Sequence, residues 1–224
     1  MQQQFTFNDH TLTVELAPPG TDEMLFDDGE LTGVAFDHTG LGRVWPASVV
    51  LCRWLAGHPA DVEGRRVLEL GAGTGLPSLL CATKLNAQHV VATDATQAVV
   101  DRLRAALAGA GAACRHEALC LPWEDSELLL AAAGTIDTVL LADVIYPMKE
   151  QAPLLTALRG LLVTKPDITI LLASTARDPK LHANLEQRLR ALPRVQLELL
   201  CNESERDPLY GNAMVYVYRL RSSV

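Results

Sequence analysis

The sequence predicts an α/β fold with a mostly parallel sheet of seven strands. From residue 66 onward, short runs rich in Val and Ile alternate with segments of helical pattern. Strands that are covered by helices on both faces carry such apolar runs, and strand–helix–strand alternation implies parallel pairing with right-handed crossovers. The last two strand-like runs have no helix between them, so the final strand is expected to return antiparallel beside its predecessor.

Five strand candidates follow this alternation. They are RVLEL (66–70), HVVATD (89–94), CRHEALC (114–120), TVLLAD (138–143) and ITILLAS (168–174). The helix-like segments between them are LPSLLCATKL (76–85), TQAVVDRLRAALAG (96–109) and residues 149–162. Two further strands are expected at VQLELLC (195–201) and AMVYVYRL (213–220), joined by a polar loop that contains Pro and Gly.

The first sixty residues lie outside this alternation. FTFNDHTLTVEL (5–16) is typical of a small hairpin, and WPASVVLCRWL (45–55) of a helix with Pro46 in its first turn. We therefore expect residues 1–60 to form an N-terminal hairpin and helix packed on a core of residues 61–224. A chain of 224 residues is long enough for one compact domain with a large core.

Composition excludes several classes of protein. The net charge of −8 argues against stable binding to nucleic acid, because affinity for phosphates depends on clustered Lys and Arg. No stretch approaches ~18 uninterrupted apolar residues, so no membrane span is expected. The N-terminus has no basic segment followed by an apolar one, so no secretory signal is expected. The sequence leaves the oligomeric state open, and a monomer is favoured.

The five cysteines are scattered and form no Cys-x-x-Cys pair. Neither a zinc site nor a disulfide framework is therefore indicated, and we expect no metal. A reducing compartment, the cytoplasm or the nucleus, fits this pattern best.

The segment RVLELGAGTGLPSLL carries the strongest local signal. A strand ends, Gly71, Gly73 and Gly75 follow at alternate positions, and a helix begins. Glycines let the backbone turn tightly and approach a ligand closely, and the helix N-terminus offers unpaired N–H groups. A Walker loop would need Gly-Lys-Ser/Thr, which is absent, and the dinucleotide fingerprint would need glycine where Leu76 stands.

Two acids accompany the loop. Glu69 lies two residues before Gly71, and Asp94 ends the second strand, where a carboxylate can accept both ribose hydroxyls. An acidic pocket without provision for phosphate suits S-adenosylmethionine, which has a ribose, an ammonium group and a sulfonium but no phosphate. The alternative is a tight strand–helix turn that binds no ligand.

Together these motifs resemble the seven-β-strand, Rossmann-like class of S-adenosylmethionine-dependent methyltransferases. Within that class VWPASVVLCRWL (44–55), LPW (121–123) and ADVIY (142–146) resemble motifs of the protein-lysine methyltransferases sometimes called methyltransferase family 16. The resemblance spans roughly residues 30 to 180, in the same order. It implies methyl transfer from S-adenosylmethionine to a protein side-chain amine, most often lysine, with S-adenosylhomocysteine as the product.

Carried over by position, the resemblance implies roles for nine residues. Those implied to contact the cofactor are Trp45, the backbone of Gly71, Ala72 and Gly73, Asp94 on the ribose, Trp123 beside the adenine and Ala142 near the methionyl part. Asp143 and Tyr146 would face the substrate. The chain departs from the family where it lacks asparagines in the segment DRLRAALAGAGA and has Glu124 after the tryptophan of the third motif. Both departures leave the substrate open.

Asp143 and Tyr146 suit an amine acceptor chemically. The carboxylate can attract and orient an ammonium group, and the phenol ring can contact it by a cation–π interaction. Alternatively, Asp143 caps the next helix and Tyr146, before Pro147, is a packing residue.

Three functions remain open: a protein-lysine methyltransferase, a methyltransferase for arginine or a small amine, and a non-catalytic interaction protein with the same fold.

Overall fold

Seven strands form the central sheet in the part of the chain that the structure describes, in the order β5-β4-β3-β6-β7-β9-β8. The structure is a computed structural model and describes residues 1–18, 40–123, 125–144, 151–207 and 210–223. The strands are β3 (Arg66–Leu70), β4 (His89–Asp94), β5 (Arg115–Cys120), β6 (Thr138–Ala142), β7 (Thr169–Ala176), β8 (Val195–Asp207) and β9 (Gly211–Ser222). The first five are parallel and β9 is antiparallel to both neighbours, which confirms the predicted fold class.

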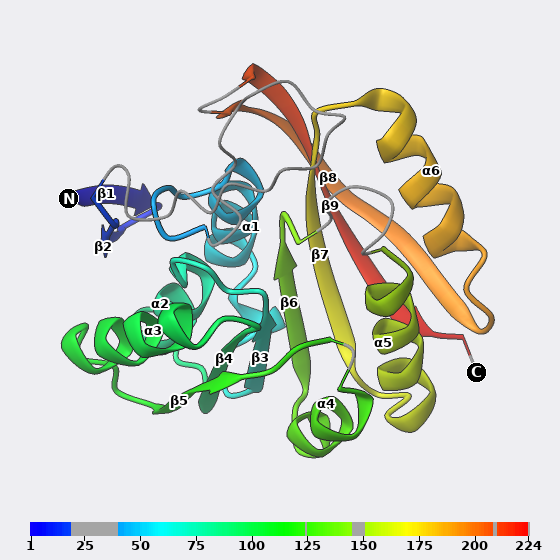
Figure 1. The fold of residues 1–224 in the computed structure, drawn as a ribbon, viewed down its shortest axis with the longest axis horizontal. Helices are drawn as coiled ribbons and strands as arrows, with labels where there is room; N and C mark the ends of the chain where they lie inside the picture. Colours follow the sequence, from blue (N-terminus) through cyan, green and yellow to red (C-terminus); the bar gives the residue numbers. More distant parts are fainter. Residues whose placement is uncertain (19–39, 124, 145–150, 208–209, 224) are drawn as a thin grey trace.

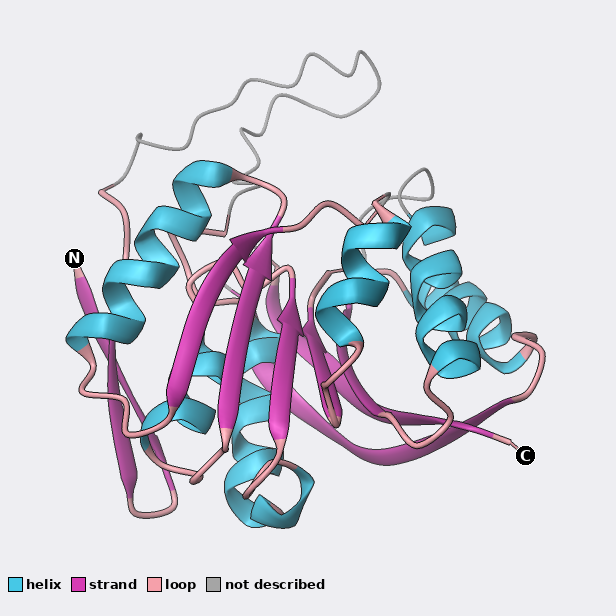
Figure 2. Ribbon diagram, turned by 90° about the horizontal axis from the view of Figure 1, so that it is seen from below, coloured by secondary structure: helices cyan, strands magenta, loops and turns pink. Residues whose placement is uncertain are grey.

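Helices cover both faces of this sheet (Figures 1 and 2). Packed on one face are α1 (Pro46–Gly57), α2 (Leu76–Thr83) and α3 (Gln97–Gly109), and on the other α4 (Ser126–Ala133), α5 (Gln151–Thr164) and α6 (Pro179–Arg190). Successive strand residues point to opposite faces, so Leu171 joins the first core and Leu172 the second. Both faces need apolar side chains, which explains the continuous Val, Ile and Leu runs.

The N-terminal segment forms the expected hairpin and helix. β1 (Gln2–Phe7) and β2 (His10–Glu15) pair antiparallel in a separate small sheet, and their Phe7, Leu12 and Val14 side chains join the core on the α1 face. After α1, a single 3-10 turn, η1 (Pro59–Asp61), leads toward β3. Asp61, the last residue of this turn, accepts hydrogen bonds on both carboxylate oxygens from the guanidinium of Arg219 in β9, at 2.9 and 3.0 Å. The division of the chain at residue 60 stays a prediction.

The last strand lies between β7 and β8, whereas the sequence indicated only that it would pair with its predecessor. Side-chain character explains this order. Val215, Val217 and Leu220 of β9 are fully buried, whereas β8 exposes alternate polar side chains. The more apolar strand therefore takes the inner position and β8 forms the edge.

No helix in the described part of the chain combines the length and apolar character needed to cross a membrane.

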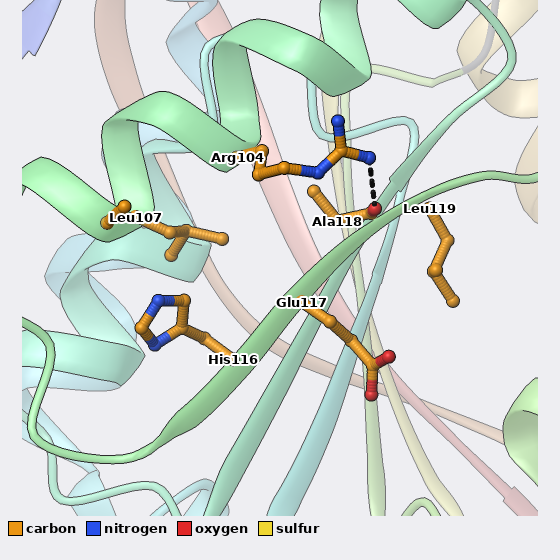
Figure 3. Close-up of a pocket in the computed structure, with 7 residues that line it drawn as sticks. Arg104, Leu107, His116, Glu117, Ala118 and Leu119 are labelled. Atoms are coloured by element: carbon orange, nitrogen blue, oxygen red, sulfur yellow. Dashed lines mark hydrogen bonds between the residues drawn. The ribbon is translucent and has the colours of Figure 1, made fainter.

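The opposite edge of the sheet is formed by β5. Arg104 reaches from α3 across this strand, and its Nη2 donates to the Ala118 carbonyl at 3.3 Å (Figure 3). A hollow of about 370 Å³ opens here between α3 and β5. The described residues that line it include none of the predicted site residues. By binding a backbone carbonyl of the edge strand β5, Arg104 hinders the pairing of this strand with a strand of another chain, in our interpretation.

Gly75 and Gly64 both have a left-handed backbone, but only at Gly75 would an added side chain also clash with a neighbour. Gly75 has φ +75°, and a Cβ built there would lie 2.5 Å from Cδ2 of the buried Leu103. Gly64 has φ +66°, with no described atom within 4 Å of such a Cβ. We expect Gly64→Ala to lower the free energy of unfolding by about 1–2 kcal/mol. Gly75→Ala should cost about 1–3 kcal/mol more, because Leu103 must move within a packed core.

Denaturant unfolding of the two variants measures this difference. Equal losses in the free energy of unfolding would show that Leu103 moves aside without an energetic cost.

Candidate functional site

The predicted site residues gather where the strand order reverses. The chain runs from β3 outward to β4 and β5, then returns to place β6 on the other side of β3. In open α/β sheets, ligands bind beyond the carboxyl ends of the strands at such a switch point. Gly71 follows β3, Asp94 ends β4 and Asp143 follows β6, so all three lie at this edge.

The glycine loop depends on left-handed backbone. Gly71, Gly73 and Gly75 have φ of +67°, +52° and +75°. The loop is tied down by the Ala72 N–H, which donates to the Thr93 carbonyl at 2.8 Å. A Cβ on Gly71 would lie 2.8 Å from Cγ1 of Val144 and 3.4 Å from Cζ2 of Trp123. The absence of a side chain at Gly71 therefore lets the loop lie directly against the segments that follow β5 and β6.

Asp94 is bound to this loop. Its Oδ2 accepts the Gly73 N–H at 3.1 Å, and its Oδ1 accepts the Thr96 N–H at 3.2 Å. Burial raises the pKa of Asp94, and these backbone hydrogen bonds act in the opposite direction. Each carboxylate oxygen has a second lone pair, so Asp94 retains the capacity to accept hydrogen bonds from a diol.

Glu69 lies beneath the loop and is only 1% exposed. Its Oε2 accepts the backbone N–H of Ser78 at 2.9 Å and also the Ser78 hydroxyl. Gly75 at the N-cap has no side chain, so Glu69 supplies the cap that the first turn of α2 otherwise lacks. Burial raises the pKa of Glu69 to about 8, against the effect of the Ser78 hydrogen bonds. Its predicted contact with the cofactor stays a prediction.

Trp45 joins the N-terminal segment to the site. It precedes α1 and is 7% exposed. A Cβ built on Gly40 would lie 3.2 Å from Trp45 Nε1 and 3.7 Å from the Cα of Gly73, so Gly40 brings the indole close to the glycine loop. The guanidinium carbons of Arg43 and Arg177 lie 5.3 and 4.9 Å from the centre of the Trp45 ring.

The remaining predicted residues follow β5 and β6. Trp123 is half-buried beside Gly71, and Ala142 is buried at the end of β6, opposite Ala173 of β7. Asp143 comes next, with a left-handed φ of +53°. Tyr146 lies outside the described residues.

The Asp143 carboxylate is 3% exposed and accepts five hydrogen bonds from the described residues. Thr175 donates its N–H to Oδ1 at 2.9 Å and its hydroxyl to Oδ2 at 2.6 Å. The Ala47 N–H donates to Oδ2 at 3.2 Å. Arg177 donates Nη1 to Oδ1 at 3.4 Å and Nη2 to Oδ2 at 3.1 Å. Donors from the protein thus surround the carboxylate.

Arg177 was missed by the sequence reasoning. Besides binding Asp143, its Nε donates to Oδ2 of the fully buried Asp207 at 2.8 Å. Burial disfavours the charged guanidinium, but the two carboxylates outweigh that effect and raise the pKa of Arg177. Thr175 and Arg177 lie at the carboxyl end of β7, so the strand-end rule that selected Asp94 and Asp143 would have selected them too.

The buried Glu69 makes stability depend on pH. Because its folded-state pKa of about 8 exceeds its ordinary value of 4.5, the folded state retains a proton that the unfolded state loses. The stabilisation is complete below the ordinary pKa and is lost as pH rises toward the folded pKa. We expect wild type to lose up to about 1.4 kcal/mol per pH unit relative to Glu69→Gln across this window.

Urea unfolding of both proteins at several pH values measures that difference. A difference that does not change with pH would mean that Glu69 ionises at its ordinary pKa in the folded protein.

Comparison with known protein families gives a direct match. The sequence profile of the family described as Lysine methyltransferase matches residues 31–188. The chain is 33% identical to the Protein-lysine N-methyltransferase EFM3 of Chaetomium thermophilum, over 62% of this chain and 44% of that protein. It is 35% identical to EEF1A lysine methyltransferase 3 of Mus musculus, over 60% and 56%. It is 32% identical to Protein N-lysine methyltransferase METTL21A of Danio rerio, over 79% and 75%.

The chain thus spans about half the length of the first two relatives. Among solved structures, a SAM-dependent methyltransferase from Aquifex aeolicus aligns with a TM-score of 0.55 at 15% identity, over 76% of this chain and 89% of that one. The [4+2]-cyclase SpnF aligns with a TM-score of 0.58 at 16% identity, over 78% and 81%. These two similarities show the fold alone. The family match covers more than half of the sequence, and the chain belongs to the lysine methyltransferase family.

Proposed function

We propose that this protein transfers a methyl group from S-adenosylmethionine to a lysine side chain of another protein. One observation carries the proposal. In a chain of the lysine methyltransferase family, the loop Gly71–Gly75, Asp94 and the segment containing Asp143 meet at the switch point of the sheet. The proposed substrate is a protein with an accessible lysine, in the cytoplasm or the nucleus.

The residues around the loop fit S-adenosylmethionine. Residues 71–78 contain no Lys or Arg to hold a phosphate, and Asp94 has lone pairs suited to the ribose hydroxyls. Gly71 has no side chain, so its backbone lies close to Val144 and Trp123. We assign the ribose to Asp94, the adenine to Trp123, and the methionyl part to Ala142, Trp45 and the Gly71–Gly73 backbone. Glu69 supports this loop from beneath through Ser78.

The acceptor side of the site is assigned to Asp143 and Tyr146. Bound S-adenosylmethionine supplies a methyl group on a sulfonium: as the amine lone pair forms the N–C bond, the S–C bond breaks, sulfur keeps the electron pair, and the amine proton leaves to water. The protein must hold the amine in line, at roughly 3–3.5 Å, and in its neutral form. A free carboxylate would instead favour the ammonium form, so positioning is the role we assign to Asp143.

Arginine is the second candidate acceptor. The chain is 30% identical to the Histone-arginine methyltransferase METTL23 of Xenopus laevis, over 55% of this chain and 52% of that protein. The two acceptors differ in the charge of the group that the site must bind. A guanidinium stays protonated at any physiological pH, whereas a lysine amine can be bound in its neutral form.

Removal of the Asp94 carboxylate should weaken cofactor binding. We expect Asp94→Ala to raise the Kd for S-adenosylmethionine about 10- to 150-fold, the range for hydrogen bonds to a charged group. Asp94→Asn, which keeps an acceptor for Gly73, should lose less. The control is Asp101→Ala: Asp101 is exposed and pairs with Arg104 on α3. Calorimetric titration measures all four proteins, and unchanged affinity in Asp94→Ala would contradict the ribose assignment.

Incubation with tritiated S-adenosylmethionine and cell extract, followed by mass spectrometry of the labelled product, identifies the acceptor. We expect label on a lysine of a single protein or a few proteins. Label on arginine would establish the second candidate, and label only on small molecules would refute a protein substrate. Cofactor binding without transfer in any extract would favour a non-catalytic protein.

A further inference from the structure

We propose that Arg177 is a positioning residue for methyl transfer, which acts through Asp143. Its guanidinium neutralises the carboxylate beside the acceptor and fixes its orientation, so that the amine is bound without a strong local preference for its ammonium form. This inference rests on the proposed function and adds to it the residue that controls the charge at the acceptor site.

Protein donors saturate the Asp143 carboxylate. A carboxylate offers about four lone-pair sites. Asp143 accepts five hydrogen bonds from described groups, two of them from Arg177. These donors, and Arg177 in particular, therefore limit how strongly the carboxylate can bind an incoming ammonium. Asp143 in this state is an anchored group, and a strong ammonium ligand arises only if Arg177 is removed.

Arg177 also sets the charge around the Asp143 carboxylate. Arg177 follows β7 and Asp207 ends β8, while Arg43, before α1, lies beside Trp45. Arg177 lies between the carboxylates of Asp143 and Asp207, at 3.1 and 2.8 Å. Without it, the buried Asp143 carboxylate would lose its cationic partner, and an amine bound beside it would retain its proton more strongly.

The Arg177 guanidinium also joins several segments of the chain. It contacts the segment after β6, the end of β8 and, over the ring of Trp45, the start of α1. Trp45 in turn lies close to the glycine loop through Gly40. A single side chain thus connects the acceptor side of the site with the loop assigned to the cofactor.

The test compares Arg177→Met and Arg177→Lys with wild type, using an identified protein substrate and saturating S-adenosylmethionine. The pH dependence of kcat reports ionisations in the enzyme–substrate complex. For Arg177→Met we expect the acidic limb to move up by about one pH unit, with kcat about tenfold lower on that limb. The KM for the protein substrate should fall as well, because the exposed carboxylate binds ammonium tightly. Arg177→Lys keeps the charge and should restore the limb to within a few tenths of a unit.

The same substitutions in the Asp143→Asn background show whether Arg177 acts through Asp143. We expect Arg177→Met to lower kcat less than about threefold there, and to lower the melting temperature less than in wild type, because no buried carboxylate at residue 143 is left unpaired. The melting temperature needs no substrate. If Arg177→Met alone does not fold, a folded Arg177→Met/Asp143→Asn protein supports action through Asp143, and failure of the double variant to fold contradicts it.

Each outcome bears on one claim. An acidic limb that coincides with that of wild type in Arg177→Met, or equal effects in both backgrounds on kcat and melting temperature, would overturn the role of Arg177 and leave the methyltransferase proposal standing. An inactive wild type, with cofactor bound and every extract unlabelled, would overturn the proposed function and this inference with it.

Discussion

The pairing of Asp143 with Arg177 joins parts of the chain that are far apart in sequence. Asp143 follows β6, Arg177 follows β7, Asp207 ends β8, and the Ala47 N–H that binds Asp143 belongs to the first turn of α1. Removing two charges from water is costly, and the attraction between them offsets that cost only when hydrogen bonds satisfy the remaining lone pairs. The five donors on Asp143 meet this condition. The Asp143–Arg177 pair therefore mainly fixes the relative positions of the segments that follow β6 and β7 at the edge of the sheet.

Glu69 and Asp94, the two other acids of the site, differ in burial and in the groups that they bind. Glu69 is buried beneath the loop and binds Ser78, whereas Asp94 is at the rim and binds Gly73. Burial raises the pKa of both groups, and for Glu69 to about 8. Glu69 can therefore support the turn as a neutral acid, while Asp94 is the carboxyl group placed to meet a ligand.

Fold and function rest on different observations in this protein. The architecture is shared with a SAM-dependent methyltransferase and also with a [4+2]-cyclase, so the sheet by itself does not specify a reaction. The family match adds that the chain belongs to the lysine methyltransferase family. The assignment of individual residues rests on the contacts among the glycine loop, Asp94 and the Asp143 network.

The sequence by itself determined the βα alternation, the glycine loop, the acid at the end of β4 and the antiparallel final strand. Local patterns suffice for these features, because strand burial, turn conformation and ligand chemistry each leave a mark on neighbouring residues. Only the tertiary structure decided that β9 lies inside β8, that Glu69 turns toward Ser78, and that Arg177 binds Asp143 and Asp207. These features depend on which strands become neighbours and on how charges share a buried space. Such contacts link residues distant in the chain and have no local periodicity by which a single sequence could reveal them.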